Sequence, residues 1–187
     1  MNTQSSSQWD GLRHYAYQKQ KLFYGGRTNS DFHDDPSSTH LGIQGKLHIA
    51  IISPFKQLIY RVFTVMAQKG ICGRGVLIDH VSYALKHGLY HDAVSHHSIP
   101  LSELKASLEE QGTELLPGDV LLIRSGFTRT FNSMSKEELK RLGASPPSFT
   151  GVETGDEVAK WVWDRQFSAV GGDAPSWEAW REYDHSS

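Results

Sequence analysis

Short apolar runs flanked by glycine recur in the second half of the chain. Residues 74–79 and 118–124 are two such runs, and residues 167–172 form a third that ends in a glycine pair. Runs of this length and composition are typical of buried β-strands. Because segments with helical spacing lie between them, the pattern predicts strands that alternate with helices, and hence a mixed α/β fold.

The segments between these runs carry signals for the ends of helices. Residues 81–87 stop at Gly88, and residues 101–108 place three leucines at helical spacing ahead of Gly112. Glycine commonly follows the last turn of a helix, because that position favours a left-handed backbone conformation. We therefore expect one helix to end at each glycine.

Two further helices are expected to begin at capping boxes. Ser135 with Glu138, and Thr154 with Glu157, have the spacing in which each side chain satisfies the free backbone amide of the other residue. The second of these helices would direct an apolar side that includes Trp161 toward the core.

The first seventy residues follow a different pattern. Residues 25–39 are rich in Gly, Asn, Asp and Ser and predict a surface loop. Residues 47–65 are apolar, but Pro54, Lys56 and Arg61 interrupt them. No uncharged run therefore approaches the roughly 20 residues that a membrane-spanning helix needs, and no contact with a membrane is expected.

Composition narrows the classes of function. The 187 residues, 38% of them hydrophobic, suffice for one core, so a single domain is expected. A net charge of -2 without long Lys/Arg runs argues against a nucleic-acid partner and favours a small molecule. The first twenty residues lack the apolar stretch of a secretory signal, which predicts a cytoplasmic location. Cys72, the single cysteine, is expected to be a small buried thiol and not a nucleophile.

Four side chains that could hold a metal or move a proton stand near the beginning of the chain. Gln4, Gln8, Asp10 and His14 lie at offsets 0, 4, 6 and 10. Asp10 could give a hard anionic oxygen to a divalent metal, and His14 could take a proton from a bound water. The alternative is that Asp10 and His14, four residues apart, form an ordinary hydrogen-bonded pair at the surface.

This spacing resembles the motif His-x-Gly-Thr-His-x-Asp-x-x-x-His of the putative cyclase family of metal-dependent amide hydrolases, which includes bacterial kynurenine formamidases. Gln4 and Gln8 fall on its first two histidines, Asp10 on its aspartate and His14 on its last histidine. The segment is also similar to a variant in a fungal branch of the family. Further blocks of that branch resemble, in the same order, residues 41–44, 69–79, 118–124 and 172–175.

The resemblance implies both a fold and a reaction. The fold is the swivelling β/β/α domain, an α/β type. The reaction is hydrolysis of a small-molecule amide by an arylformamidase of tryptophan catabolism, with N-formylkynurenine as the substrate class and zinc or manganese as cofactor. By this resemblance Asp10, Gln4 and Gln8 hold the metal, His14 is the base, and a homodimer is expected because dimers are common among relatives.

Two more residues are expected to contact the substrate. Trp9 lies inside the motif segment, and Asp173 follows a predicted strand, where α/β folds commonly place functional groups. A tight turn would explain Asp173 equally well. Four histidines between residues 87 and 97 are interpreted as an exposed helix end and loop.

Departures from the family pattern leave alternatives open. A neutral glutamine is a poorer nitrogen ligand than an imidazole, so replacement of both histidines should weaken zinc binding in particular. The chain is expected to be one partial domain over residues 1–187, without the family's first strands and last helices, and residues 45–66 to be an insert from a retained intron. The competing hypotheses are an inactive small-molecule binding or interaction protein of the same fold, and a defective gene model of an active enzyme.

Overall fold

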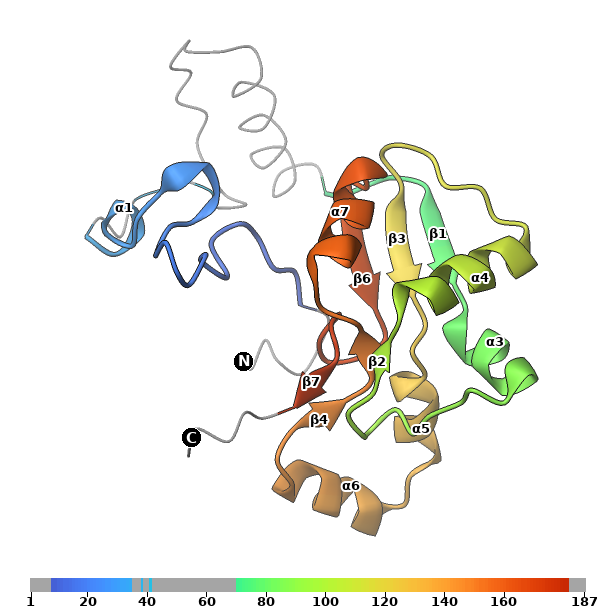
Figure 1. Ribbon diagram of the computed structural model, residues 1–187. Coiled ribbons are helices and arrows are strands. Elements are labelled where there is room, and N and C mark those ends of the chain that lie inside the picture. Colours follow the sequence, from blue (N-terminus) through green and yellow to red (C-terminus); the bar gives the residue numbers. More distant parts are fainter. Residues whose placement is uncertain (1–7, 35–37, 39–40, 42–69, 182–187) are drawn as a thin grey trace. The chain divides into compact units, whose positions relative to one another are not determined.

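The computed structural model describes residues 8–34, 38, 41 and 70–181 (Figure 1). Contacts divide the chain into two compact units, Met1–Cys72 and Gly73–Ser187. Gln4 and residues 45–66, expected to be a metal ligand and an insert, lie outside the described residues. The expectation of a single domain stays a prediction.

Residues 8–34, the continuous described part of the first unit, form closed turns and two short helical segments. Its helical pieces are a 3-10 turn, η2 (Tyr24–Gly26), and the one-turn helix α1 (Ser30–His33). The loop predicted over residues 25–39 is therefore interrupted by one helical turn. Asp31 stabilises the start of this turn, because its carboxylate accepts a hydrogen bond of 2.7 Å from the backbone N–H of Thr28.

The second unit contains most of the regular structure. Its strands are β1 (Gly75–Ile78), β2 (Ser98–Ile99), β3 (Val120–Ile123), β4 (Ser148–Phe149), β5 (Gly151–Val152), β6 (Ala169–Gly172) and β7 (Trp180–Arg181). Its helices are α3 (His80–His87), α4 (Leu101–Gln111), α5 (Phe127–Ser133), α6 (Lys136–Ala144) and α7 (Asp156–Asp164).

A three-stranded parallel sheet organises this unit. The strand order is β1-β3-β6, with Leu77 opposite Leu122 and Leu122 opposite Gly171. These are the three strands that the apolar runs predict, and helices separate them along the chain. The mixed α/β fold is thereby confirmed. Two smaller pairings complete the unit, β2 with β5 in parallel and β4 with β7 antiparallel.

Helices α4 and α7 bury their apolar sides with the sheet in one core (Figure 1). The three leucines of α4, predicted from their spacing, are all buried. Burial of one leucine side chain contributes about 1.5–3 kcal/mol, so this helix contributes strongly to stability. The core consists of Val76, Ile78, Ile99, Leu101, Leu104, Leu108, Leu121, Ile123, Val152, Val158 and Trp161.

The predicted helix ends are confirmed, and one predicted start is wrong. Gly88 and Gly112 adopt left-handed φ angles of 69° and 64° at the ends of α3 and α4. The capping box at the start of α6 has both of its hydrogen bonds. At α7 the N-cap is Gly155 and no side chain caps it. Thr154 thus lies one residue too early for its hydroxyl to cap the helix.

A glutamine side chain covers the outer edge of β1. The Gln111 amide accepts a hydrogen bond of 2.9 Å from the backbone N–H of Asp79 and donates one of 2.8 Å to the carbonyl of Leu77. These are the backbone groups that a further strand would pair with. Gln111 thereby protects this edge against pairing with another chain.

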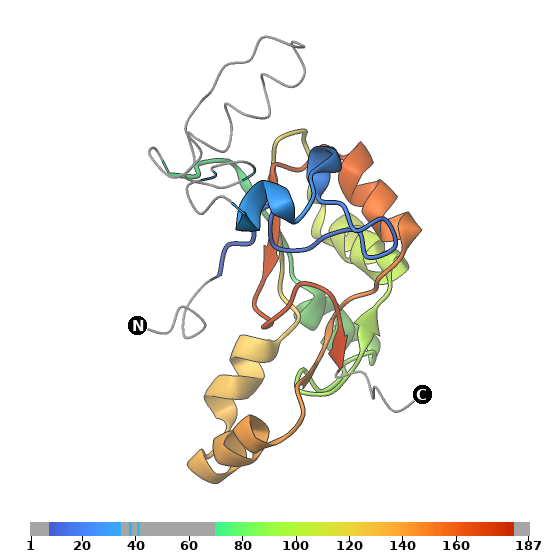
Figure 2. The same ribbon diagram turned by 90° about the vertical axis from the view of Figure 1, so that its left-hand side faces the viewer.

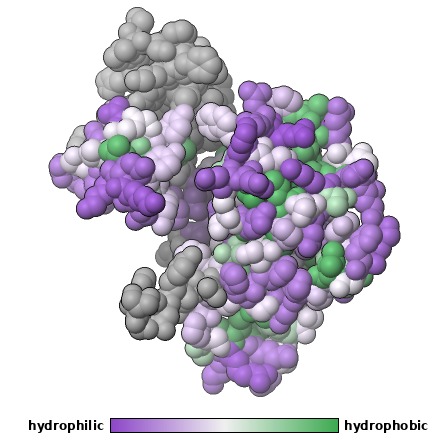
Figure 3. All heavy atoms as spheres, in the orientation of Figure 1, coloured by the Kyte–Doolittle hydropathy of each residue, from purple (hydrophilic) through white to green (hydrophobic). Residues whose placement is uncertain are grey.

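Helices α5 and α6 extend from the sheet as a pair with no fully buried residue (Figure 2). Space-filling colouring shows a surface on which hydrophilic residues predominate and hydrophobic ones are scattered (Figure 3). Cys72 is exposed, so the expectation of a buried thiol is wrong. It precedes β1 in a segment without helix or strand, and no core forms around it. Within residues 8–34 and 70–181 no helix is long and apolar enough to cross a membrane.

An ion pair ties together the segments that enter β1 and β3. Arg74 donates to both carboxylate oxygens of Asp119, at 2.8 Å through Nε and 2.7 Å through Nη2. The Asp119 side chain is only 3% exposed and also accepts from the backbone N–H of Leu116. The hydrogen bonds from Arg74, which outweigh the opposing effect of burial, lower the pKa of Asp119 to about 2.

Replacement of Asp119 by asparagine should make the protein less stable at neutral pH and change its response to acid. The pKa of Asp119 is lower in the folded protein than its usual value of 3.8, so the ionised carboxylate stabilises the fold at any pH above 3.8. This stabilisation is lost as the pH falls toward the folded-state pKa of about 2. Urea unfolding between pH 7 and pH 2 should therefore show a gap between wild type and D119N that closes in acid. Glu109→Gln, at an exposed position of α4, is the matched control. A constant gap across this range would contradict the prediction.

Candidate functional site

The described part of the motif segment, residues 8–14, is exposed at residues 8–10 and at His14, and it turns back on itself near its end. The backbone N–H of His14 donates to the carbonyl of Gly11 at 3.0 Å. This turn brings His14 Nδ1 to 3.6 Å from Asp10 Oδ1. The two side chains remain 62% and 56% exposed. The structure thus brings together the two residues that retain the family's residue types.

The expected partners of this pair are placed differently. Gln8 and Trp9 are exposed and directly precede Asp10, with the Trp9 ring 46% accessible. Gln4 lies outside the described residues. The Asp10–His14 separation exceeds an ordinary hydrogen bond, so the alternative of a hydrogen-bonded surface pair does not describe the contact fully. Both side chains are accessible to a ligand.

The donor set of this segment fits a divalent metal in part. Asp10 offers an exposed carboxylate, a ligand type that divalent metals accept. Within residues 8–34 and 70–181, however, no group of three His, Cys, Asp or Glu side chains is arranged to hold a metal. Any shell at Asp10 would therefore need the glutamine amides, an oxygen-rich set that suits manganese better than zinc.

Asp173 lies at the carboxyl end of β6, as predicted, and its carboxylate is bound by the chain itself. Oδ1 accepts hydrogen bonds from the backbone N–H and the hydroxyl of Ser125, at 2.7 and 2.9 Å. Oδ2 accepts from the N–H groups of Gly126 and Thr128, at 3.1 and 3.2 Å. The carboxylate thus occupies the beginning of α5 and offers few free lone pairs. Contact with substrate stays a prediction.

A second acid at this edge of the sheet is also paired. Arg124, which follows β3, donates at 2.9 Å to both carboxylate oxygens of Asp79, which follows β1. Asp79 also accepts from the N–H of Ser82 and so caps α3. Burial of Asp79 raises its pKa, but the hydrogen bonds from Ser82 and the charge of Arg124 outweigh this effect, so the net pKa is lowered. This edge is held together by charge pairs.

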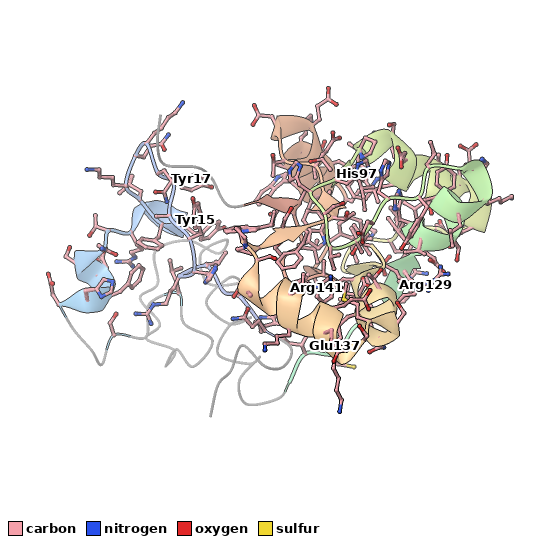
Figure 4. All side chains as sticks on the ribbon, turned by 90° about the horizontal axis from the view of Figure 1, so that it is seen from below. Tyr15, Tyr17, His97, Arg129, Glu137 and Arg141 are labelled. Carbon is pink, nitrogen blue, oxygen red and sulfur yellow. The ribbon has the colours of Figure 1, made fainter. Side chains whose placement is uncertain are left out.

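Of the four histidines expected at an exposed helix end and loop, His87, His91 and His96 are exposed and His97 is half-buried, whereas His80 was not singled out from the sequence. His80 is buried and its Nε2 lies 2.8 Å from the Glu103 carboxylate. His97 stacks on His91 with ring centroids 3.4 Å apart, and its buried Nε2 finds no hydrogen-bond partner in the described part of the chain (Figure 4). Burial, and secondarily the charge of His91, lower the pKa of His97. The density of histidines along the chain does not reveal which of them is covered.

Comparison with known proteins supplies the context for these residues. The sequence profile of a family described as putative cyclase matches residues 1–179. No curated protein sequence matches the chain. Four solved protein chains match, and one of them is described as the crystal structure of a novel cyclase. It superposes with a TM-score of 0.69 at 23% identity, over 98% of this chain and 51% of that chain. The chain spans about half the length of that structure, and the likeness establishes the fold alone.

Replacement of Asp173 by asparagine should destabilise the second unit. The asparagine side-chain nitrogen cannot accept the hydrogen bonds that Asp173 Oδ2 now accepts from two backbone N–H groups. A hydrogen bond to a charged group contributes about 1.5–3 kcal/mol. Chemical denaturation should show a loss of this order. Asp156→Asn, an exposed acid in the first turn of α7, removes the same charge and should cost less than about 1 kcal/mol. Equal losses in the two variants would contradict a structural role for Asp173.

Proposed function

The chain belongs to the putative cyclase family, and from this premise we propose that it hydrolyses the amide bond of a small aryl formamide, with a divalent metal held by residues 4–10. The observation that carries the proposal is the Asp10–His14 pair, which retains two of the four key residue types of the motif at 3.6 Å. N-formylkynurenine, a substrate of tryptophan catabolism, represents the substrate class.

Each residue of the segment has a distinct role in this proposal. Asp10, Gln4 and Gln8 would hold the metal, which supplies a Lewis acid that polarises the amide carbonyl and lowers the pKa of a bound water to about 7. His14 is the base. Its Nδ1 lies 3.6 Å from the Asp10 carboxylate, which leaves Nε2 to accept the proton of the attacking water.

The same imidazole completes the reaction. After attack of the water oxygen on the carbonyl carbon, the C–N bond breaks and His14 Nε2 returns its proton to the leaving nitrogen. Trp9, exposed beside Asp10, offers a flat apolar surface to the aryl part of the substrate. Asp173 is assigned no step in this reaction, because its carboxylate already accepts hydrogen bonds from the beginning of α5.

A second function is favoured by a different observation. Among the described residues, no third Asp, Glu, His or Cys side chain lies near Asp10 and His14 in a position to hold a metal ion with them. Neutral glutamines at two motif positions would suit a protein of the same fold that binds a small molecule without cleaving it. A cytoplasmic location, a homodimer and the absence of nucleic-acid and membrane partners stay predictions under both hypotheses.

Substitution of His14 separates these hypotheses. We expect full-length protein supplied with manganese or zinc to release formate from N-formylkynurenine, and His14→Ala to lower the rate about 10²- to 10⁴-fold, the usual contribution of a general base. Asp10→Ala should lower the metal content measured by mass spectrometry. His33→Ala, at an exposed histidine of α1, should change neither quantity. If folded wild-type protein binds an aryl formamide but releases no formate with either metal, the binding hypothesis replaces hydrolysis.

A further inference from the structure

The first unit contains a hollow with a volume of about 380 Å³. Its wall includes three aromatic side chains, Tyr17, Phe23 and Tyr24, together with Leu22, Gln20 and the glycine pair at residues 25–26. Ligand pockets in proteins commonly measure about 300–1,000 Å³ and are lined mainly by apolar and aromatic groups. By volume the hollow lies at the small end of that range, and it is open to solvent, because its lining residues are exposed or half-buried.

Two successive closed turns shape this hollow. In the first, the backbone N–H of Tyr17 donates to Leu22 at 2.8 Å and that of Lys21 donates back to Tyr17 at 2.7 Å. In the second, the N–H of Phe23 donates to the carbonyl of Arg27 at 2.7 Å. Leu22 and Phe23 join the turns. The wall therefore has its shape from backbone hydrogen bonds and does not depend on side-chain packing alone.

The glycine pair keeps one side of the hollow open. Gly25 and Gly26 have φ angles of 70° and 75°, a conformation that residues with a side chain rarely adopt. A Cβ atom at either position would meet no atom within 4 Å. The backbone here is thus accessible, and a flat group can lie directly against it.

Neighbouring side chains hold one ring of the wall, that of Phe23. Phe23 packs edge to face against Phe32, with centroids 5.0 Å apart and planes at 86°. Phe32 is buried, and the guanidinium of Arg13 lies 4.6 Å from its ring centroid. Arg13 in turn donates to the carbonyl of Ser38 at 3.3 Å. These contacts hold Phe23 in place before any ligand arrives, which reduces the entropic cost of binding.

We propose that this hollow binds a planar, uncharged aromatic ring. Aromatic walls favour another ring over an aliphatic group of equal size by about 0.5–1.5 kcal/mol, because of edge-to-face and offset-stacked contacts. Gln20, Tyr17 and Tyr24, which line the hollow, carry groups that can hydrogen-bond one polar substituent. The site goes beyond the proposed hydrolysis, since binding here needs neither a metal nor a bond cleavage.

Two probes that differ only in aromaticity test the site on the full chain without added metal. Benzamide and cyclohexanecarboxamide carry the same amide on a flat and on a puckered ring. Titration followed by ligand-observed NMR should give roughly three- to tenfold tighter binding of benzamide, the fold-change that corresponds to the aromatic preference. Equal binding of the two probes, or binding of neither, would overturn the proposal. Formate release plays no part in this readout, so a failure of the proposed function leaves the result interpretable.

Two tyrosines on the same short segment provide a matched pair of variants (Figure 4). Tyr17 lines the hollow, whereas Tyr15 is not among its lining residues, and their side chains are 64% and 74% exposed, so both substitutions should leave the fold intact. We expect Tyr17→Ala to remove the preference for benzamide and Tyr17→Phe to retain it. Tyr15→Ala should bind as wild type does. Equal weakening by Tyr15→Ala and Tyr17→Ala, with unchanged circular dichroism, would show that the hollow is not the site.

Discussion

The second unit depends most on the carboxylate of Asp173 at the beginning of α5. This one group accepts hydrogen bonds from Ser125, Gly126 and Thr128, which belong to the connection from β3 into the helix. Asp173 itself follows β6, so the carboxylate joins two neighbouring strands at their carboxyl ends and positions a helix at the same time. The positive end of the backbone dipoles and the unpaired N–H groups there favour an anion. Here the chain supplies that anion itself.

Ion pairs between side chains also join the strands of the sheet, and one of them lies at its opposite end. Arg74 and Asp119 join the segments that enter β1 and β3, while Asp79 and Arg124 join the same two strands where they end. Charged side chains at the carboxyl ends of the strands, which in many α/β proteins face a ligand, are therefore bonded here to other groups of the chain. The Asp10 and His14 side chains, in contrast, remain accessible to solvent.

Sequence patterns predicted those features that depend on neighbours along the chain. Gly88 and Gly112 end their helices as expected, because a left-handed residue at that position is a local requirement. The start predicted at Thr154 was wrong by one residue, since the backbone of Gly155 decides where α7 begins. Asp173 was expected at the end of a strand, yet its donors lie 45 to 48 positions earlier, and no local signal identifies them. The pair of His80 with Glu103, 23 positions apart, has no local signal for the same reason.

Solvent exposure of Asp10 and His14 is the main physical obstacle to amide hydrolysis at this segment. Electrostatic stabilisation of a transition state is weak in water and grows when water is excluded. A bound substrate can itself exclude water, provided that it is anchored nearby. His14 and Tyr17 are three positions apart along the chain, and a fully extended chain of that length spans at most about 11 Å between their Cα atoms. A substituted aryl amide with its ring in the hollow at Tyr17 could therefore reach the imidazole, cover it from solvent and present its carbonyl there. The aromatic hollow and the acid–base pair would then act as two halves of one site within the first unit.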